Sequence, residues 1–369
     1  MVSLCTIRAD NAALLSSQSL VAVFVGGTSG LGEYAIRSLV LTHSQATSST
    51  STQPLPSLRI YIIGRNASSA EKIITECKTI APGKEVELLF VKAADLSLLQ
   101  DVEKVCKEVM RLEAEKEARG GGKARVDWLC MSQSNSVQSF NGEKRTKEGL
   151  DTQFSLHYYS RALFSRLLLP LLLCSTLPTG AHLTSIYAAG FEATLFSDDL
   201  SLRQPTHYTF SNVRSHVNYM TTLFFETLMQ NYPGRLVATH VFPGLVITPA
   251  YYLDGYPWWF RALRAVLQAP TRWWLSLSEK EAGDRMCWTL CGRGLVNSRV
   301  NDGGDGEGEA LMGTDGVRGG GAFALGEKGE VCETRGKYVD IRKGDLGEKV
   351  WEHTNRAFDV IRKGGVFEE

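Results

Sequence analysis

The sequence lacks any long uninterrupted apolar run. The longest, Leu167 to Cys174, is far shorter than the ~20 residues that a membrane-spanning helix needs, so we expect a buried helix there. Residues 1–19 also lack the basic segment and the apolar core of a secretory signal, and we expect none. These absences favour a cytoplasmic protein.

Paired cysteines and net charge are also missing. The eight cysteines include no CxxC pair, which argues against a zinc site or a disulfide framework and favours a reducing compartment. Forty basic residues balance forty acidic ones, so nothing indicates nucleic acid as a partner. A chain of 369 residues is long enough for one large α/β domain with extensions, or for two domains.

What the sequence does contain is a glycine-rich turn between a strand and a helix. Residues 21–25 are apolar and β-rich, and residues 31–40 carry apolar side chains at helical spacing. We expect Gly27 to adopt backbone angles closed to other residues, and Gly30 and Gly32 to leave room for a pyrophosphate at the helix N-terminus. This predicts the first half of a dinucleotide-binding βαβ unit, the alternative being an ordinary strand–helix turn. The turn comprises Gly26, Gly27, Thr28, Ser29, Gly30, Leu31 and Gly32.

Further strands and helices alternate along the chain. Apolar, β-rich runs predict strands at 58–63, 87–91, 126–131, 180–185 and 235–242, and helical spacing predicts helices at 69–81, 98–118, 148–174 and 210–226. This alternation predicts an α/β fold, a Rossmann-type doubly wound parallel sheet with helices on both faces.

Arg65 follows the second strand, where such a fold meets the adenosine ribose. An acidic residue there would bind the ribose 2′-hydroxyl, whereas an arginine suits a 2′-phosphate. Arg65 therefore favours NADP(H) over NADH, with a plain loop-capping arginine as the alternative.

The spacing of the glycine turn resembles the TGxxxGxG motif of the short-chain dehydrogenase/reductase (SDR) superfamily, with Gly26 where that family has Thr. The resemblance spans residues 20–250 and implies several cofactor contacts. Asp95 and Leu96 would meet the adenine, although Asp95 could equally cap the next helix. The family's Asn-Asn-Ala-Gly after strand four is replaced by residues 131–134, whose Ser132 and Gln133 could bind a ribose. The segment Pro243, Gly244 and Thr248 would contact the nicotinamide carboxamide.

The catalytic half of the family pattern is altered. The resemblance implies that Ser185, at the end of strand five, orients the substrate, unless it only ends the sheet. His157 stands where the family's relay Asn holds a water, and an imidazole could also titrate near neutrality or simply pack between helices. The family's YxxxK is absent, and Phe210 and Arg214 stand at the Tyr and Lys positions. Arg214 could still bind the ribose or a phosphate.

Because phenylalanine cannot donate a proton, the acid must come from elsewhere or be unnecessary. We favour a displaced acid, Tyr208 first, with Tyr187 and His207 as alternatives. Catalysis by cofactor and water alone, or a non-redox role, stays open.

The segment after the proline–glycine turn is rich in tryptophan. Residues 251–277 hold four of the seven tryptophans. The resemblance implies that residues 251–291 are substrate-lid helices, and their tryptophans favour a large hydrophobic substrate. Two alternatives stay open, an ordinary core helix and contact with a membrane surface. The latter would use Trp258, Trp259 and Trp273 with Arg261, Arg264 and Arg272.

The ends of the chain complete the predicted organisation. Residues 1–19 form an extension, and the Gly-rich residues 292–330 form a mobile loop, in which 323–331 could be a short strand pair. Residues 331–369 form a C-terminal extension with an amphipathic helix that packs back on the domain. Its inner face would carry Val350, Trp351, Ala357, Phe358 and Ile361.

The altered strand-four motif, the lid and the tail resemble a filamentous-fungal subgroup from natural-product pathways. The resemblance implies an NADPH-dependent interconversion of ketone and alcohol on a bulky hydrophobic molecule. The alternatives are an SDR-derived isomerase or cyclase and an NADP(H)-binding pseudo-enzyme or sensor. The family also implies a possible homodimer, although the tail could block one such surface.

Overall fold

A computed structural model describes residues 1–46, 56–83, 85–135, 142–253, 255–270, 276–298, 310–332, 338, 341–342 and 344–369, without the side chains of 267–270. Seven parallel strands form one sheet in the order β3-β2-β1-β4-β5-β6-β7. Consecutive strands run outward in both directions from β1 and β4, which places a topological switch point between them. The strands are β1 (Leu20–Val25), β2 (Leu58–Gly64), β3 (Val86–Lys92), β4 (Trp128–Met131), β5 (Ala181–Ile186), β6 (Leu236–Val241) and β7 (Ala322–Leu325).

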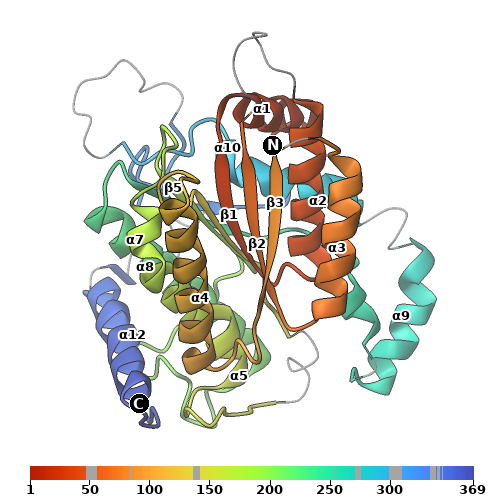
Figure 1. Ribbon diagram of the computed structural model, residues 1–369. Helices are drawn as coiled ribbons and strands as arrows, with labels where there is room; N and C mark the ends of the chain where they lie inside the picture. The colour runs from red at the N-terminus through yellow and green to blue at the C-terminus, as the bar shows by residue number, and fades with distance from the viewer. Residues whose placement is uncertain are drawn as a thin grey trace.

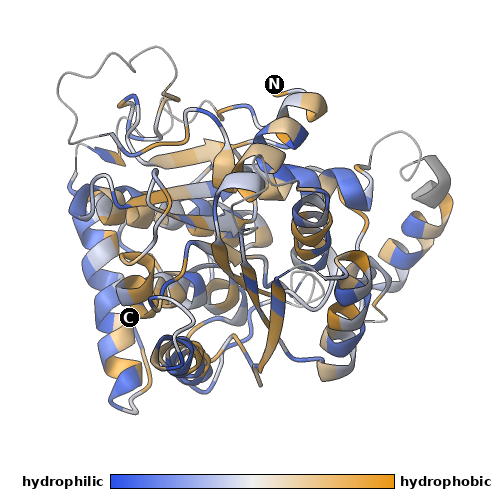
Figure 2. Cartoon of the chain, turned by 45° about the horizontal axis from the view of Figure 1, so that its top comes forward, coloured by the Kyte–Doolittle hydropathy of each residue, from blue (hydrophilic) through white to orange (hydrophobic). Residues whose placement is uncertain are grey.

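Helices cover both faces of the sheet, as Figure 1 shows. The two faces bury separate apolar layers, in keeping with strands that are mostly apolar (Figure 2). One face carries α1 (Leu4–Ser17), α2 (Gly30–Gln45), α3 (Ala67–Ile80) and α10 (Glu279–Cys291). The other carries α4 (Leu99–Ala118), α5 (Thr152–Phe154), the π-helical turn η2 (Ser155–Tyr159), α6 (Ser160–Leu167), α7 (Leu169–Leu172), α8 (Phe210–Asn231) and α12 (Leu346–Arg362).

The predicted doubly wound α/β fold is confirmed, but the chain after residue 250 differs from expectation. β7 lies within the predicted loop 292–330 and joins the sheet beside β6. The expected strand pair is reduced to a single bridge between Leu325 and Val331. α10 is a core helix against α2, not a lid, because Met286, Cys287 and Leu290 bury an apolar face there. The sheet and its covering helices therefore extend past the predicted domain boundary.

The amphipathic C-terminal helix packs as expected. Val350, Ala357 and Ile361 of α12 are buried with α4 and α8, and the Trp351 ring stacks on Phe224 at 5.2 Å. α12 thus covers part of the face formed by α4 and α8. Only α9 (Trp258–Pro270), among the described helices, stands off the body, at the right of Figure 1.

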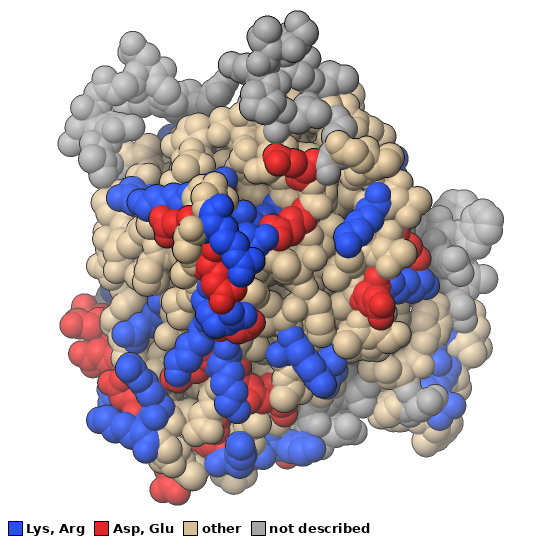
Figure 3. All heavy atoms as spheres, viewed as in Figure 1, with Lys and Arg blue, Asp and Glu red and all other residues tan. Residues whose placement is uncertain are grey.

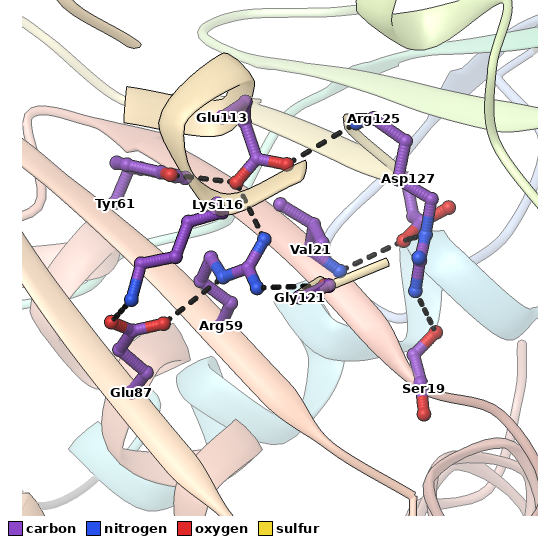
Figure 4. A network of polar contacts seen from close by, with 10 residues as sticks. All are labelled: Ser19, Val21, Arg59, Tyr61, Glu87, Glu113, Lys116, Gly121, Arg125 and Asp127. Carbon is purple, nitrogen blue, oxygen red and sulfur yellow. Dashed lines mark hydrogen bonds and ion pairs between the residues drawn. The ribbon is translucent and has the colours of Figure 1, made fainter. Parts of the chain in front are cut away.

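A buried charge network occupies the amino ends of the strands (Figure 4). The fully buried Glu113 accepts hydrogen bonds from Arg59 Nη1 at 2.8 Å and from the Tyr61 hydroxyl at 2.6 Å. The equally buried Asp127 accepts from Arg125 Nε at 2.9 Å. Because these carboxylates are all satisfied, this end of the sheet is structural, and the carboxyl ends are left for ligands.

On the face seen in Figure 3, basic and acidic side chains are interspersed, and the blue basic ones cover more of the surface. Over the full sequence the two signs balance, with a net charge of zero. Among the described residues no helix is both long and apolar enough to cross a bilayer.

Candidate functional site

A cleft of about 1000 Å³ opens at the carboxyl ends of the strands. This is where a doubly wound sheet binds its ligands. Thirteen of the predicted site residues line it, and they come from the ends of β1, β2, β3, β4 and β6 and from α8. They are Gly26, Thr28, Ser29, Gly30, Leu31, Arg65, Asp95, Leu96, Ser132, Arg214, Pro243, Gly244 and Thr248.

The glycine turn is closed over the end of β4. A Cβ placed on Gly32 would lie 2.6 Å from Gly26 O and 2.7 Å from Ser132 Oγ, so no side chain fits there. Gly26 and Gly30 have φ angles of +84° and +61°, which favour glycine. Our expectation that Gly27 takes such angles was wrong. It is instead limited by space, since its Cβ would lie 3.0 Å from Ile36 and Phe24.

The family's Thr could not replace Gly26 without movement of the backbone. A Cβ on Gly26 would lie 2.7 Å from the backbone N of Gln133. The glycine at position 26, where the family has Thr, therefore goes together with the close approach of the altered segment after β4. Ser132 also holds the end of β4 against the end of β1, because its Oγ donates a hydrogen bond of 3.1 Å to Val25 O.

Thr248, which follows β6, lies against the glycine turn. A Cβ on Gly30 would lie 3.2 Å from Thr248 Cβ, which shows how closely the two segments approach. Gly244 has a φ of +73°, as a tight turn after β6 requires. The segment after β6 and the segment after β1 thus form two adjoining walls of one cleft.

Asp95 does not cap the following helix. Its Oδ1 accepts from Ser97 N at 2.9 Å and from Ser97 Oγ at 2.7 Å, which closes a local turn. The N-terminus of α4 is capped instead by Glu148, whose carboxylate accepts from Leu99 N at 2.6 Å and from Gln100 N at 3.1 Å. Spacing along the sequence could not show this, because Glu148 is 49 residues away from Leu99.

His157 lies in the π-helical turn η2, buried just behind the cleft. Its Nδ1 lies 3.0 Å from Gln153 O, which can only accept, so Nδ1 carries the proton. Nε2 then accepts from Ser134 Oγ at 3.1 Å, and Ser134 lines the cleft. Burial and the nearby Arg161 lower the pKa of His157 to about 3. The imidazole therefore does not titrate near neutrality, and it orients Ser134.

Ser185 is completely buried, and the buried Arg161 side chain contacts its hydroxyl. The Arg161 guanidinium donates to Ser185 Oγ at 2.8 Å, to Ile186 O at 2.9 Å and to Gln133 O at 2.8 Å. Burial lowers the pKa of Arg161 to about 10, so it keeps its charge at neutral pH. Arg161 thereby joins the ends of β4 and β5 beneath the cleft. The sequence analysis missed it, because an arginine inside a predicted helix carries no signal of burial.

Arg214 reaches the cleft from the first turns of α8, as expected for its position. Its Nε is buried and has no hydrogen-bond partner among the described residues. The guanidinium carbon lies 4.9 Å from the Phe191 ring centroid and 5.8 Å from that of Phe210. Phe210 is 51% exposed and also lines the cleft. Aromatic rings thus hold a cation that is free to meet an anion or a hydroxyl.

The three predicted proton donors are not among the residues that line the cleft. The Tyr208 hydroxyl donates to Asp151 Oδ2 at 3.0 Å, and burial raises its pKa. Tyr187 stacks on His157 at 4.4 Å, and burial raises its pKa to about 12. His207 Nδ1 lies 2.8 Å from Asp199 Oδ2. The geometry therefore does not support Tyr208, Tyr187 or His207 as the displaced acid.

The cleft also contains side chains that the sequence analysis did not select. Lys144, Arg145 and Lys147 line it beside Asp95 and the residues that follow it. Tyr251, Tyr256 and Phe260 line its outer part, and the Tyr256 and Phe260 rings stack at 4.7 Å. The two lysines lie in a loop that has no periodic pattern. Only the cluster of basic residues after strand four could have suggested that they line the cleft. Trp273 and Arg272 of the predicted lid lie outside the described residues.

Comparisons with known proteins place the chain in a family. No protein-family model matches it. It is 35% identical over 373 residues to the short-chain dehydrogenase/reductase SAT2 of Stachybotrys chartarum, with 98% of each chain covered. It is 30% identical over 365 residues to the oxidoreductase AN1596 of Emericella nidulans, with 97% of this chain and 98% of that one covered.

Among solved structures, an L-sorbose reductase from Gluconobacter frateurii gives a TM-score of 0.48 at 17% identity, over 75% of this chain and 91% of that one. That likeness is too weak to argue from. The full-length identity to SAT2, together with the sheet order and the glycine turn, is sufficient: this chain belongs to the short-chain dehydrogenase/reductase family.

Proposed function

We propose that this protein is an NADPH-dependent oxidoreductase that interconverts a ketone and an alcohol on a bulky hydrophobic molecule. We further propose that it acts in the cytoplasm, in fungal natural-product biosynthesis. The observation that carries the proposal is the glycine turn, closed on the end of β4 with no room for a Cβ at Gly32 and with Arg65 on the same cleft.

The residues of the cleft fit a dinucleotide. Ser29, Gly30 and Leu31 bring the N-terminus of the 16-residue helix α2 to the cleft, where its free N–H groups favour a pyrophosphate. Gly26 and Gly30 hold the backbone in angles that allow this close approach. Ser132, Gln133 and the Pro243–Gly244 turn also line the cleft, and we propose that they contact a ribose and the nicotinamide.

The charges of the cleft support the phosphorylated cofactor. Five basic side chains line it against one carboxylate, that of Asp95. Arg145 forms an ion pair with Glu143, whereas no ion pair of Arg65 or Lys147 with a carboxylate is seen among the described residues. An excess of cations suits NADPH, which carries one phosphate more than NADH. The basic residues are Arg65, Lys144, Arg145, Lys147 and Arg214.

The bound cofactor would supply the hydride, and the chain would bind, orient and protonate. The Arg214 guanidinium lines the cleft and would hold a ribose hydroxyl or the substrate oxygen. Tyr251 lines the cleft just after Thr248, and we propose its hydroxyl as the proton donor in place of the missing family tyrosine. Ser134, whose hydroxyl proton is donated to His157, would accept one further hydrogen bond.

The apolar part of the cleft indicates the kind of substrate. Val246, Ala250, Tyr256, Phe260 and Phe210 line it together with Tyr251. Such a wall favours a large, apolar ring system over a small polar one. The homodimer that the family implies stays a prediction, because α12 covers part of the α4 and α8 face.

The test is NADPH consumption by the purified protein with a panel of polycyclic and aromatic ketones. We expect turnover with NADPH, little turnover with NADH and none without ketone. Product formation without cofactor consumption would instead support an isomerase or cyclase. Binding of NADPH without turnover of any ketone would support a sensor.

A further inference from the structure

The helix α9 presents an unusual outer surface. Trp258 is 80% exposed and Val266 is 76% exposed, and Trp259 and Leu263 are each about half exposed. At 100° per residue, positions 258, 259, 262, 263 and 266 share one arc roughly 140° wide. This arc contains only apolar side chains, and it faces solvent. Contiguous apolar surface of this kind marks a site of interaction.

The other side of α9 belongs to the cleft. Phe260 lies opposite the outer arc, and its ring contacts Tyr251 at 5.7 Å and Tyr256 at 4.7 Å between centroids. Arg264 on the same side donates to Tyr251 O and lies 5.2 Å from the Tyr252 ring centroid. The helix is thus attached to the cleft by one face, while Trp258, Leu263 and Val266 on its other face are exposed.

The charge around this face identifies what could cover it. From Gly255 to Ser278 the sequence contains three arginines and no acidic residue. Figure 3 shows blue spheres and no red ones on α9. Two copies of α9 would therefore repel one another, which argues against self-association through this face. An anionic surface would be attracted to it.

We infer that α9 docks the protein on an anionic phospholipid surface. Tryptophan prefers the boundary between headgroups and acyl chains, because its ring is apolar and its N–H stays hydrated. Arg261 flanks the apolar arc and would meet lipid phosphates. The helix would lie in the plane of the surface without crossing it. This docking would bring the mouth of the cleft to the membrane, where hydrophobic small molecules concentrate, and it does not depend on the proposed redox reaction.

The test is sedimentation of the full-length protein with vesicles of phosphatidylcholine alone and of phosphatidylcholine mixed with phosphatidylserine. We expect binding to the mixed vesicles that weakens with added salt, and much weaker binding to phosphatidylcholine alone. The double variant Trp258→Ser/Val266→Ser should lower affinity for mixed vesicles on the order of a hundredfold. Arg261→Glu should lower it about tenfold and remove most of the preference for anionic lipid.

A matched control is Val317→Ser, because Val317 is 44% exposed and lies outside α9. It should bind vesicles like the unchanged protein. All variants should keep the unchanged thermal unfolding temperature, since the altered side chains are exposed. Failure to bind mixed vesicles, or equal binding by the double variant, would overturn the proposal. A dimer in light scattering that the double variant abolishes would assign the face to a second copy instead.

Discussion

Arg161 Nη1 donates a hydrogen bond of 2.8 Å to Ser185 Oγ, and both side chains are buried beneath the cleft. Because a guanidinium can only donate, Ser185 must accept from it, and the hydroxyl proton of Ser185 stays available for another acceptor. Arg161 therefore acts on the site through Ser185 and the strand ends. It is a positioning residue.

Replacement of Arg161 should affect the positioning of Ser185 more than the binding of the cofactor. Arg161→Met leaves Gln133 O and Ile186 O without their donor, which costs about 1–3 kcal/mol per buried group. We expect a lower unfolding temperature and a kcat reduced at least about tenfold, with a smaller change in the dissociation constant for NADPH. Arg161→Lys should recover part of the kcat. Equal losses in kcat and cofactor affinity would instead indicate general damage to the fold.

The closed glycine turn predicts a sharp loss of cofactor binding in Gly32→Ala. The added Cβ would lie 2.6 Å from Gly26 O, so the turn must move. We expect NADPH affinity to fall about a hundredfold or more, with a cost of about 1–3 kcal/mol in stability. Gly344→Ala is the matched control, because a Cβ there meets nothing within 4 Å. Calorimetric titration of both variants decides the matter, and intact binding by Gly32→Ala would refute the role of the turn.

Tyr251 and Tyr208 can be distinguished by the same substitution. Tyr251→Phe should lower kcat by about a hundredfold or more and leave NADPH binding intact, as removal of a general acid does. Tyr208→Phe removes only the hydrogen bond to Asp151 and should cost about 1 kcal/mol of stability with little change in kcat. The reverse pattern, measured by steady-state kinetics, would restore Tyr208 as the proton donor.

Buried histidines predict marked acid sensitivity. Burial lowers the pKa of each to about 3 or 4, against a usual 6.5, so the unfolded chain binds more protons between these values. The free energy of unfolding is therefore at its full value above pH ~6.5. It falls as the pH drops toward 4, by about 1.4 kcal/mol per histidine and pH unit. Glu148 and Glu226, whose pKa burial raises, oppose this in part. The histidines are His157, His182, His216, His240 and His353.

His240 offers the cleanest test of this sensitivity, because both ring nitrogens are buried without a partner among the described residues. His240→Leu should remove one group that takes up a proton on unfolding. The free energy of unfolding should then fall less steeply as the pH drops, by about 1.4 kcal/mol per pH unit. Urea unfolding at several pH values between 7 and 5 would measure it. Parallel stability curves for the two proteins would show that His240 is already protonated in the folded state.

The sequence predicts this fold well where its signals are local. The apolar runs locate β1 to β6, and Gly32 marks the turn that Ser132 closes. It fails where the partner is distant in the sequence. β7 has only four residues and joins the sheet some eighty residues after β6, and Glu148 caps α4 from another loop. These contacts depend on tertiary packing, which no local pattern records.

The candidate proton donors were harder to predict for the same reason. Tyr208 is near the altered motif in sequence, yet its hydroxyl turns to Asp151, whereas Tyr251 reaches the cleft from beyond Thr248. His157 lies just behind the cleft, and its burial beside Arg161 could not be predicted from the spacing of residues in the sequence. Proximity along the chain is a poor guide to which hydroxyl lines a cleft.

The most direct test of the proposed function is a calorimetric titration of the unchanged protein and of Arg65→Asp with NADPH and, separately, with NADH. We expect the unchanged protein to bind NADPH at least about tenfold more tightly than NADH, and Arg65→Asp to lose NADPH affinity while largely keeping that for NADH. Equal losses for both cofactors would contradict the assignment of the 2′-phosphate to Arg65. No binding of either cofactor by the unchanged protein would contradict the proposed redox function itself.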